Sequence, residues 1–344
     1  MDIAIYGGGI SGLWTLNRLR ALGYDAHLFE PRALGGQQSI ASQGIIHGGM
    51  KYALNGLRGK QDTSLSKMPD RWEACLLGRG ELDLTNARVV QKYQTMEFQN
   101  KLYGKLVSLL LKSKVVYSHG NVYALHEPVI DVKSVITELS KSPYIYHTQF
   151  PSEPAALKIY TAGMGNELAP VSKKTQRRPL RMIMMAGAPY PLFTHFVGFK
   201  SKPLATITTH YINDQSTELV WYIGGQIAEQ ACFEEHPIEY AKAELKKIMP
   251  RVNFERNKRW AYHDVFRAEP LTIDGSLPSQ PMLVAENNVC VAWPTKLAMA
   301  PLLADKVIDW VKSKNIQPKQ SPARNLAKPP IAMYPWESVV DWKL

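Results

Sequence analysis

The sequence predicts an α/β fold that opens with a Rossmann-like, dinucleotide-binding unit. Three observations support this prediction. An apolar segment with a glycine motif begins the chain, a polar glycine-rich run occupies residues 35–49, and segments rich in β-branched and aromatic residues recur over 170–260. The first pattern is typical of a strand–turn–helix unit, and the last is typical of strands separated by turns. With 344 residues, the chain can bury a large core and form two structural units.

The first predicted element is a nucleotide-binding turn. An apolar strand, Ile3–Tyr6, leads into Gly7-x-Gly9-x-x-Gly12, a leucine-rich helix follows, and a second strand ends at Glu30. Gly7 allows the tight turn, Gly9 lets the backbone approach a pyrophosphate, and Gly12 lets the helix pack close to the strand. The helix N-terminus offers N–H groups and a positive dipole end to phosphates, and Glu30 is placed to bind ribose hydroxyls. An ordinary glycine turn would not need all of these features together.

The segment after Glu30 distinguishes between the two common dinucleotides, NAD and FAD. A nicotinamide-dependent enzyme usually continues into another βα unit, whereas residues 31–49 are small, polar and rich in glycine. Such a run lets the backbone pass close to a large flat ligand and supplies many hydrogen-bond donors. Here the chain resembles the D-amino-acid-oxidase-like superfamily of flavoproteins. Within it, His47-Gly-Gly-Met-Lys-Tyr52 is similar to the HGGLRY segment of FAD-dependent glycerol-3-phosphate dehydrogenases, which lies beside the isoalloxazine ring.

The resemblance implies a Rossmann-like FAD-binding domain interleaved with an α+β substrate domain built on a mainly antiparallel sheet. The FAD-binding domain would comprise residues 1–100, 128–170 and 261–315, and the substrate domain residues 101–127 and 171–260. Within the latter we expect a helix over about Pro237–Ile248, because Pro250 lies just beyond its end. Residues 316–344 are rich in proline, and we expect them to form an extended tail on the surface.

A third segment resembles a cofactor-binding strand end of the superfamily. The strand Lys158–Tyr160 closes on Thr161-Ala162-Gly163, although an ordinary strand–turn would have the same pattern. Together with the motif and the glycine-rich run, it completes the expected FAD-binding set. That set comprises Gly7, Gly9, Ile10, Ser11, Gly12, Glu30, Pro31, Arg32, Gln38, Ser42, Gln43, Gly44, Ile46, His47, Thr161, Ala162, Gly163, Pro294, Thr295, Lys296 and Leu297.

The C-terminal members of this set belong to a strand–turn–helix pattern. A buried strand, Val289–Ala292, precedes a helix that we expect to begin near Thr295. The helix N-terminus and the cation of Lys296 would stabilise the negative charge of reduced flavin at its N1–C2=O edge. Lys296-Leu297 falls on the Lys-Leu of a GGKLTTYRKLAE motif in the glycerol-3-phosphate dehydrogenases, but Trp293-Pro294 stands where that motif has glycines.

Three residues are candidates for catalysis. Lys296 would stabilise reduced flavin or assist its reoxidation, or it is a surface lysine. His47 is a candidate base or flavin neighbour, a possible covalent attachment point, or a hydrogen-bonded core histidine. Arg267 corresponds to an arginine that holds the anionic group of the substrate in the superfamily, because its fork of donors suits a carboxylate or phosphate. The alternative for Arg267 is a structural ion pair with Glu269 or another acid.

The resemblance implies an FAD-dependent oxidase or dehydrogenase. It would transfer hydride from a CH–OH or CH–NH carbon of a small anionic substrate to flavin N5. The formal net charge of +11 fits a solvated basic surface, an anionic substrate or a nucleic acid. A tRNA-modifying flavoprotein that acts on an amino-acid-like group is therefore the alternative. The basic residues form two groups: Lys173, Lys174, Arg177, Arg178 and Arg181; and Lys242, Lys246, Lys247, Arg251, Arg256, Lys258 and Arg259.

The cysteines and the hydropathy pattern indicate the compartment. Cys75, Cys232 and Cys290 are scattered, so they suggest neither a disulfide framework nor a metal site, and we expect no metal. No apolar run approaches the length of a membrane span, and the first strand follows Met1 directly, so we expect no signal peptide. A reducing cytoplasm fits these features best, and the oligomeric state stays open.

Overall fold

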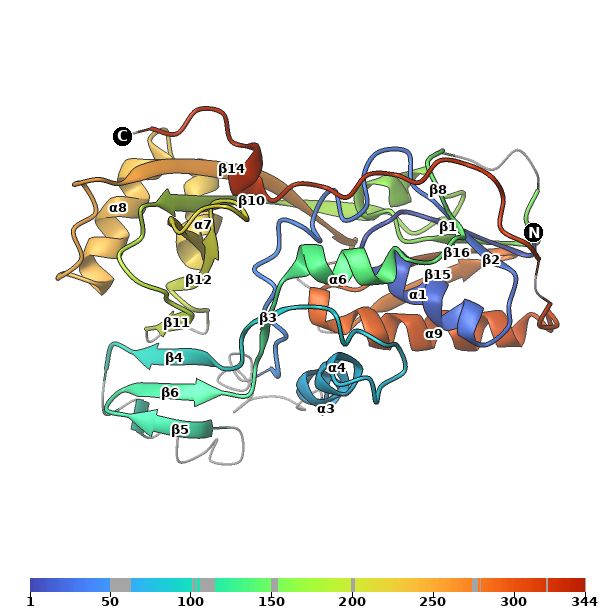
Figure 1. Cartoon of the computed structure of the whole chain (residues 1–344), viewed down its shortest axis with the longest axis horizontal. Helices are drawn as coiled ribbons and strands as arrows, with labels where there is room; N and C mark the ends of the chain where they lie inside the picture. Colours follow the sequence, from blue (N-terminus) through green and yellow to red (C-terminus); the bar gives the residue numbers. More distant parts are fainter. Residues whose placement is uncertain are drawn as a thin grey trace.

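Two β-sheets stand side by side in the computed structural model, with helices packed against each (Figure 1). The structure describes residues 1–49, 63–100, 102, 104–105, 115–149, 154–198, 202–273, 278, 280–319 and 321–343. One sheet has six strands, in the order β15-β16-β9-β1-β2-β8, and the other has eight, in the order β14-β10-β13-β12-β11-β4-β6-β5. A short pair, β3 (Val89–Gln91) with β7 (Val129–Ile130), lies apart from both. This mixed architecture confirms the predicted fold class.

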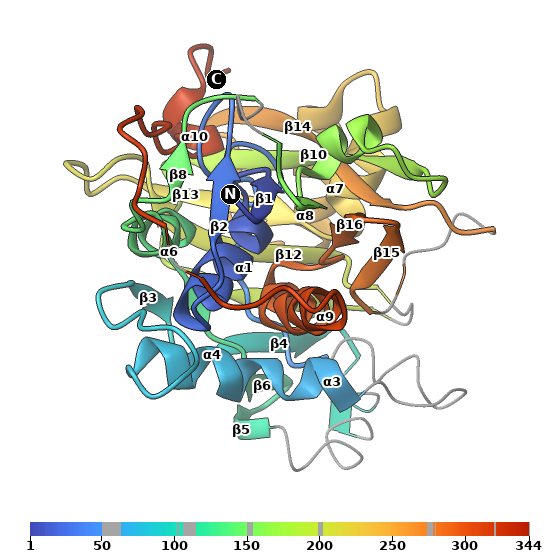
Figure 2. The ribbon, with the colours of Figure 1, turned by 90° about the vertical axis from the view of Figure 1, so that its right-hand side faces the viewer.

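The six-stranded sheet is the predicted Rossmann-like unit. Its strands run parallel except for the edge strand β15, which pairs antiparallel with β16. Alternate residues of each strand point to opposite faces, so Ile3 and Ile5 join the helix-covered core while Tyr6 joins an aromatic cluster on the other face. Figures 1 and 2 both place α1 and α9 along one face of this sheet. The elements are β1 (Ile3–Tyr6), α1 (Ile10–Ala21), β2 (Ala26–Phe29), α6 (Val132–Leu139), β8 (Ile145–Tyr146), β9 (Leu157–Tyr160), β15 (Met282–Glu286), β16 (Val289–Trp293) and α9 (Ala300–Ser313).

The eight-stranded sheet is mainly antiparallel, as the resemblance implied. Only β11 and β4 pair in parallel among its described strands. The predicted helix over Pro237–Ile248 is confirmed as α8 and packs with α7 on one face of the sheet. The elements are β4 (Gln94–Phe98), β5 (Val115–His119), β6 (Val122–Leu125), β10 (Thr175–Ala186), β11 (Thr194–Val197), β12 (Ala205–Tyr211), β13 (Leu219–Gly224), α7 (Gln226–Gln230), α8 (Pro237–Ile248) and β14 (Arg259–Pro270). Two further helices, α3 (Thr63–Ser66) and α4 (Met68–Leu76), precede this sheet in the chain.

The two faces of the eight-stranded sheet bury different partners. Ile183, Trp221 and Ile223 pack with α7 and α8. Their neighbours along the strands, among them Met184 and Tyr222, belong to the same core cluster as β1 and α1. Because side chains alternate along a strand, the second face is directed toward the six-stranded half of the molecule. Side chains on that face can therefore meet the glycine-rich run.

Sheet pairing differs from the expected domain ranges at two places. β4 lies between β11 and β6, and β14 pairs with β10 along its whole length, so both strands belong to the eight-stranded sheet. The expected ranges had grouped residues 94–98 and 261–270 with the FAD-binding domain. Neither strand carries a local signal that selects one sheet over the other. The division into two domains itself stays a prediction.

The C-terminal segment is more than the surface tail that we expected. Ile331 forms a bridge with Leu34, and Lys343 forms one with Trp260, so this segment contacts both halves of the molecule (Figure 1). Between these bridges lies the short helix α10 (Pro335–Ser338), and the side chains of Tyr334 and Trp336 are buried. The expectation of a purely superficial tail was wrong because large aromatic side chains gain most when they leave water.

Candidate functional site

The glycine turn between β1 and α1 has no space for side chains. Gly7 has a φ of +109°, and a Cβ at this position would lie 2.5 Å from the Cα of Ala162. A Cβ on Gly12 would lie 2.0 Å from the carbonyl oxygen of Gly7 and 2.7 Å from Oγ1 of Thr161. The segment Thr161–Gly163 after β9 therefore lies directly against the turn. The N-cap of α1 is Gly9, which has no side chain to accept a hydrogen bond from the helix.

Polar groups around this turn fit a dinucleotide. The Glu30 carboxylate at the end of β2 accepts hydrogen bonds from the N–H of Gly8 (2.8 Å) and of Arg32 (2.9 Å), so it is held beside the turn. Each of its oxygens has a further lone pair for a ribose hydroxyl. The hydroxyl of Ser11, in the first turn of α1, is buried and has no hydrogen-bond partner among the described residues. Buried polar atoms are nearly always satisfied, so the Ser11 hydroxyl at this helix N-terminus fits a bound polar group.

The glycine-rich run connects the two sheets. Gln43 donates from Nε2 to the carbonyl oxygens of Thr206 and Tyr222, at 2.9 Å each, and so attaches the run to β12 and β13. Gly44 has a φ of +69°, and a Cβ there would lie 2.3 Å from the carbonyl oxygen of Ile130. Gln38 approaches the other strand end, since a Cβ on Gly163 would lie 3.2 Å from its Nε2. The run thus passes between the predicted cofactor turn and the inner face of the eight-stranded sheet.

The remaining members of the expected FAD-binding set in this region have varied surroundings. Pro31 and Arg32 are exposed, and Ser42 donates to the carbonyl oxygen of Ser39. The N–H of Ile10 donates to Oγ of Ser39 at 3.0 Å, and the N–H of Ile46 donates to the carbonyl oxygen of Pro128. Met50, Lys51 and Tyr52 of the HGGMKY segment lie outside the described residues.

The C-terminal pattern has a different turn from the expected one. Thr295 has a φ of +62°, a left-handed conformation that is rare for a β-branched residue and normally taken by glycine. A 3₁₀ turn, Leu297–Met299, follows, and α9 begins only at Ala300, not near Thr295. The left-handed residue interrupts a helical path, and Pro301 fits the first turn of the later helix. The buried indole N–H of Trp293 has no hydrogen-bond partner among the described residues, so a donor for a ligand remains beside this turn.

Four charged residues gather where β14 approaches this turn. Arg178 Nε lies 2.9 Å from a carboxylate oxygen of Glu269, whose side chain is buried. Burial raises the pKa of the Glu269 carboxyl, and neighbouring cations oppose this effect without outweighing it. Those cations include Arg178, Arg267 and Lys296. The structure therefore brings two of the predicted catalytic residues, Lys296 and Arg267, to one acid.

Arg267 forms an ion pair with another acid than Glu269, as the alternative of a structural ion pair allowed. Its Nη1 lies 3.2 Å from Oε1 of Glu229 on α7, and its Nη2 donates to the carbonyl oxygen of Pro179 at 3.3 Å. Its Nε is buried and has no hydrogen-bond partner among the described residues. The guanidinium is thus oriented by two groups. Its buried Nε–H could donate a hydrogen bond to an anion.

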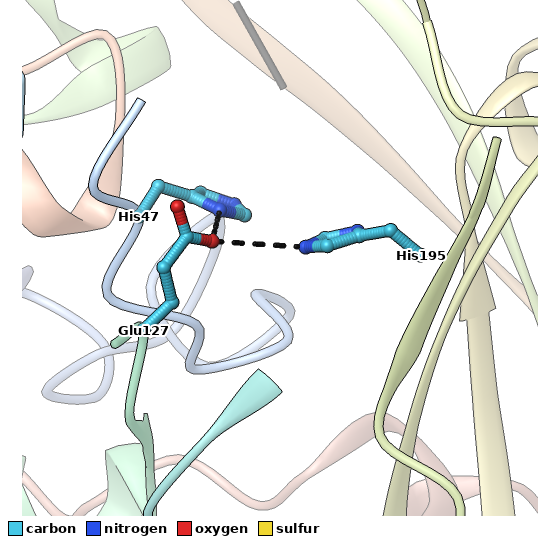
Figure 3. Close-up of side chains that lie close together, drawn as sticks. All are labelled: His47, Glu127 and His195. Atoms are coloured by element: carbon cyan, nitrogen blue, oxygen red, sulfur yellow. Dashed lines mark hydrogen bonds and ion pairs between the residues drawn. The ribbon is translucent and has the colours of Figure 1, made fainter. Parts of the chain in front are cut away.

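The third predicted catalytic residue, His47, belongs to a buried cluster with Glu127 and His195 (Figure 3). Nδ1 of His47 lies 3.2 Å from Oε2 of Glu127, and Nε2 of His195 lies 3.8 Å from the same oxygen. Oε1 of Glu127 accepts a hydrogen bond from the N–H of Gly48 at 2.7 Å. Burial would raise the pKa of Glu127, but the hydrogen bonds and charges of the two histidines lower it well below its usual range. Glu127 is therefore a carboxylate that orients both imidazoles.

Sequence reasoning singled out neither Glu127 nor His195. Glu127 follows β6, His195 lies in β11, and His47 ends the glycine-rich run, so no local spacing connects them. The available signal was a single acid within the apolar stretch Ala124–Ile130. A further missed residue is Gln94, whose N–H donates to the carbonyl oxygen of Glu127 and whose buried side-chain amide has no hydrogen-bond partner among the described residues.

The chain is similar in sequence and in fold to known FAD-dependent oxidoreductases. A family model described as "DAO: FAD dependent oxidoreductase" matches residues 2–103. A protein named "Probable FAD-dependent oxidoreductase PA4991", from Pseudomonas aeruginosa, is 36% identical in sequence, over 98% of this chain and 97% of the relative. The crystal structure of PA4991 superposes with a TM-score of 0.82 at 32% identity and covers 98% of this chain and 97% of that one.

Two more distant structures share the fold. Glycine oxidase from Geobacillus kaustophilus superposes with a TM-score of 0.59 at 13% identity, over 94% of this chain and 96% of that one. L-alpha-glycerophosphate oxidase from Mycoplasma pneumoniae, in a structure with FAD bound, gives a TM-score of 0.58 at 13% identity, over 96% of this chain and 99% of that one. These two similarities concern the fold alone.

Proposed function

Because the chain belongs to the DAO family of FAD-dependent oxidoreductases, we propose that it oxidises a small anionic substrate at a carbon bearing a hydroxyl or an amine. Bound FAD supplies the redox chemistry by accepting a hydride at its N5 atom. The residues proposed to hold FAD are those of the glycine turn, Glu30, the glycine-rich run, Thr161–Gly163 and Pro294–Leu297. The N-terminus of α1, whose N-cap is a glycine, and the buried hydroxyl of Ser11 support this assignment.

The observation that carries the proposal is the contact between His47 and the buried Glu127. Since the carboxylate can only accept, the facing Nδ1 of His47 carries the proton, and Nε2 is the ring nitrogen that can accept one. A buried carboxylate also stabilises the imidazolium that forms when His47 takes a proton. We propose that His47 removes the proton from the substrate's hydroxyl or amine and that Glu127 orients it.

Substrate binding is assigned to the charged group at the end of β14. Arg267 is held by Glu229 and keeps a buried donor, which supports its role as the anion-binding residue. Lys296, close enough to Glu269 to affect its pKa, is proposed to stabilise the reduced cofactor. Alcohol and amine substrates both satisfy these groups. The names of glycine oxidase and L-alpha-glycerophosphate oxidase illustrate the two possibilities within one fold.

The experiment is anaerobic reduction of the FAD-loaded protein by a panel of amino acids, hydroxy acids and polyol phosphates. We expect at least one small anion to bleach the flavin absorbance, and His47→Asn to slow that bleaching at least a hundredfold while FAD stays bound. If no member of the panel bleaches the flavin, the substrate class is wrong. If His47→Asn reacts like the wild type, the role of His47 is wrong.

The alternative of an RNA substrate has weaker support. Six of the twelve basic residues in the two groups form ion pairs with acids of the same chain, among them Arg177 with Glu167 and Arg259 with Glu218. Such pairing reduces the charge available to phosphates.

None of the described helices is long and apolar enough to cross a membrane. A cytoplasmic location remains a proposal, supported by the scattered free cysteines.

A further inference from the structure

We propose that His47, Glu127 and His195 form a binding site for a divalent transition-metal ion, with Zn²⁺ the preferred ion. We propose further that the bound ion inhibits the enzyme. The metal site stands on geometry alone. The inhibition rests on the proposed function, because an ion bound to Nδ1 would remove the contact with Glu127 that makes His47 a base.

The first argument is the convergence of three donor atoms on one point. Oε2 of Glu127 lies 3.2 Å from Nδ1 of His47 and 3.8 Å from Nε2 of His195, and all three atoms lie within 4.8 Å of one another. In a tetrahedral zinc site, bonds of about 2.0–2.2 Å place the ligand atoms roughly 3.3 Å apart. Figure 3 shows both rings directed at the same carboxylate oxygen, His47 from the glycine-rich run and His195 from the strand of the eight-stranded sheet. Small rotations of these side chains would therefore complete the coordination.

The second argument is that His195 and Glu127 each have their other polar atom fixed by a contact outside the cluster. Nδ1 of His195 lies 2.9 Å from Oγ1 of Thr206, which leaves Nε2 directed at Glu127. Oε1 of Glu127 accepts from the N–H of Gly48, which leaves Oε2 for the shared position. Metal-binding histidines and carboxylates typically have such outer partners, which fix the ring tautomer and the orientation of the donor.

The donor set and its exposure determine the ion and its access. Two imidazoles and one carboxylate favour Zn²⁺ or Fe²⁺ over Mg²⁺ and Ca²⁺, which prefer oxygen donors only. The side chains of Glu127 and His195 are buried, whereas that of His47 is 16% exposed. An ion would therefore reach the site past His47, and its remaining coordination position would face the same side.

A second group of potential ligands, Asp70, Glu73 and His126, serves as a natural control. Here Nδ1 of His126 lies 3.4 Å from Asp70, and Nε2 lies 3.4 Å from Glu73. The two acids contact opposite nitrogens of the ring, so only one of these contacts lies on the nitrogen that would bind an ion. All three side chains are also substantially exposed.

The test is equilibrium dialysis of chelator-treated, FAD-loaded protein against Zn²⁺ at pH 7.5, with zinc measured by mass spectrometry. We expect one tightly bound Zn²⁺ per chain. His195→Ala and Glu127→Gln should each weaken binding at least tenfold, and His126→Ala should not change it. The flavin spectrum and thermal unfolding of each variant verify that it is folded. Wild-type protein without stoichiometric zinc, or His195→Ala that binds like the wild type, would overturn the site.

Inhibition is measured separately as the ratio of flavin bleaching rates with and without one equivalent of Zn²⁺. We expect at least a tenfold decrease in the wild type, reversed by EDTA, and no zinc effect in His195→Ala. Stoichiometric binding without inhibition would overturn the inhibitory role and leave the metal site. Failure of His47→Asn to slow bleaching in zinc-free buffer would instead refute the proposed function of His47, whatever the zinc result.

Discussion

The imidazole of His210 stacks on the indole of Trp336, with ring centroids 4.2 Å apart and planes inclined by 24°. His210 lies in β12 of the eight-stranded sheet and Trp336 lies in α10 of the C-terminal segment. Tyr334 also stacks on Trp336, at 4.4 Å, and its hydroxyl donates to Asp131 at the start of α6. This stack therefore attaches the C-terminal segment to both halves of the molecule.

The first prediction is that stability decreases in mild acid because of His210. Removal from water lowers the pKa of His210 to about 4, despite the opposing charge of Asp131. The unfolded chain binds a proton at this histidine below about pH 6.5, whereas the folded chain does not. The contribution of neutral His210 to the free energy of unfolding is therefore fully present above pH 6.5. It is lost as the pH falls toward 4, by up to roughly 3 kcal/mol.

Thermal unfolding between pH 8 and pH 5 measures this effect. His210→Phe keeps an aromatic ring against Trp336 and removes the titrating group, so its Tm should fall less over the same interval. An equal fall in Tm for both proteins would assign the acid sensitivity to other groups.

Trp336→Ala should lower the free energy of unfolding by about 3–5 kcal/mol at neutral pH, as expected for a buried tryptophan.

The second prediction concerns the glycine turn. Gly12→Ala should prevent FAD binding, because the new Cβ would lie 2.0 Å from the carbonyl oxygen of Gly7 and force the turn to move. The measurement is the FAD content of the purified protein and its recovery on addition of FAD. Gly120→Ala is the control, since a Cβ there meets nothing within 4 Å. It also introduces strain at a positive φ, so a loss of FAD in both variants would attribute the effect to general instability.

Local sequence signals predicted the elements that we propose to bind the cofactor, and tertiary contacts account for what these signals missed. The turn at Gly7–Gly12 is defined by residues within one βα unit, and α8 is bounded by Pro237 and Pro250, so both could be recognised in the sequence. The helix near Thr295 was expected too early, because one left-handed residue is not visible in a hydrophobic pattern.

The histidine–glutamate cluster could not be predicted in the same way. Its three residues come from a loop, a strand end and a strand in different parts of the chain. The pairing of β4 with β6 and β11 brings Glu127 to His195, and the bridge between Ile45 and Val129 brings His47 to Glu127. The burial of Tyr334 and Trp336 has a similar origin. A proline-rich segment has no hydrophobic periodicity to indicate which side chains are buried. Its aromatic residues pack against elements that are distant in the sequence.

The third prediction concerns Lys296. Lys296→Met keeps the aliphatic chain and removes the charge, so it should slow flavin reduction or reoxidation by an order of magnitude or more. Stopped-flow absorbance separates the two half-reactions. Lys306→Met, at an exposed position of α9, is the matched control and should change neither rate. Wild-type rates in both half-reactions of Lys296→Met would remove this lysine from the mechanism.

The last prediction concerns Arg267 and distinguishes a substrate contact from a structural ion pair. Arg267→Ala should keep FAD and the fold, because Glu229 retains a second partner in Lys202, 2.8 Å away. It should nevertheless lower kcat/KM for the anionic substrate about tenfold to a hundredfold, through loss of a charge-assisted hydrogen bond from the buried Nε. Arg267→Lys should recover only part of this loss, since an ammonium lacks the planar fork of donors.

Arg177→Ala is the control. Arg177 lies on the neighbouring strand β10 and forms an exposed ion pair with Glu167. It should leave kcat/KM unchanged within about twofold, because exposed pairs contribute little. If Arg267→Ala unfolds or releases FAD, its pair with Glu229 is structural, and the substrate anion must be held elsewhere. Arg178 would then be the next residue to change. It lies opposite Arg267 in the β10–β14 register and contacts the buried Glu269 at the same end of the sheet.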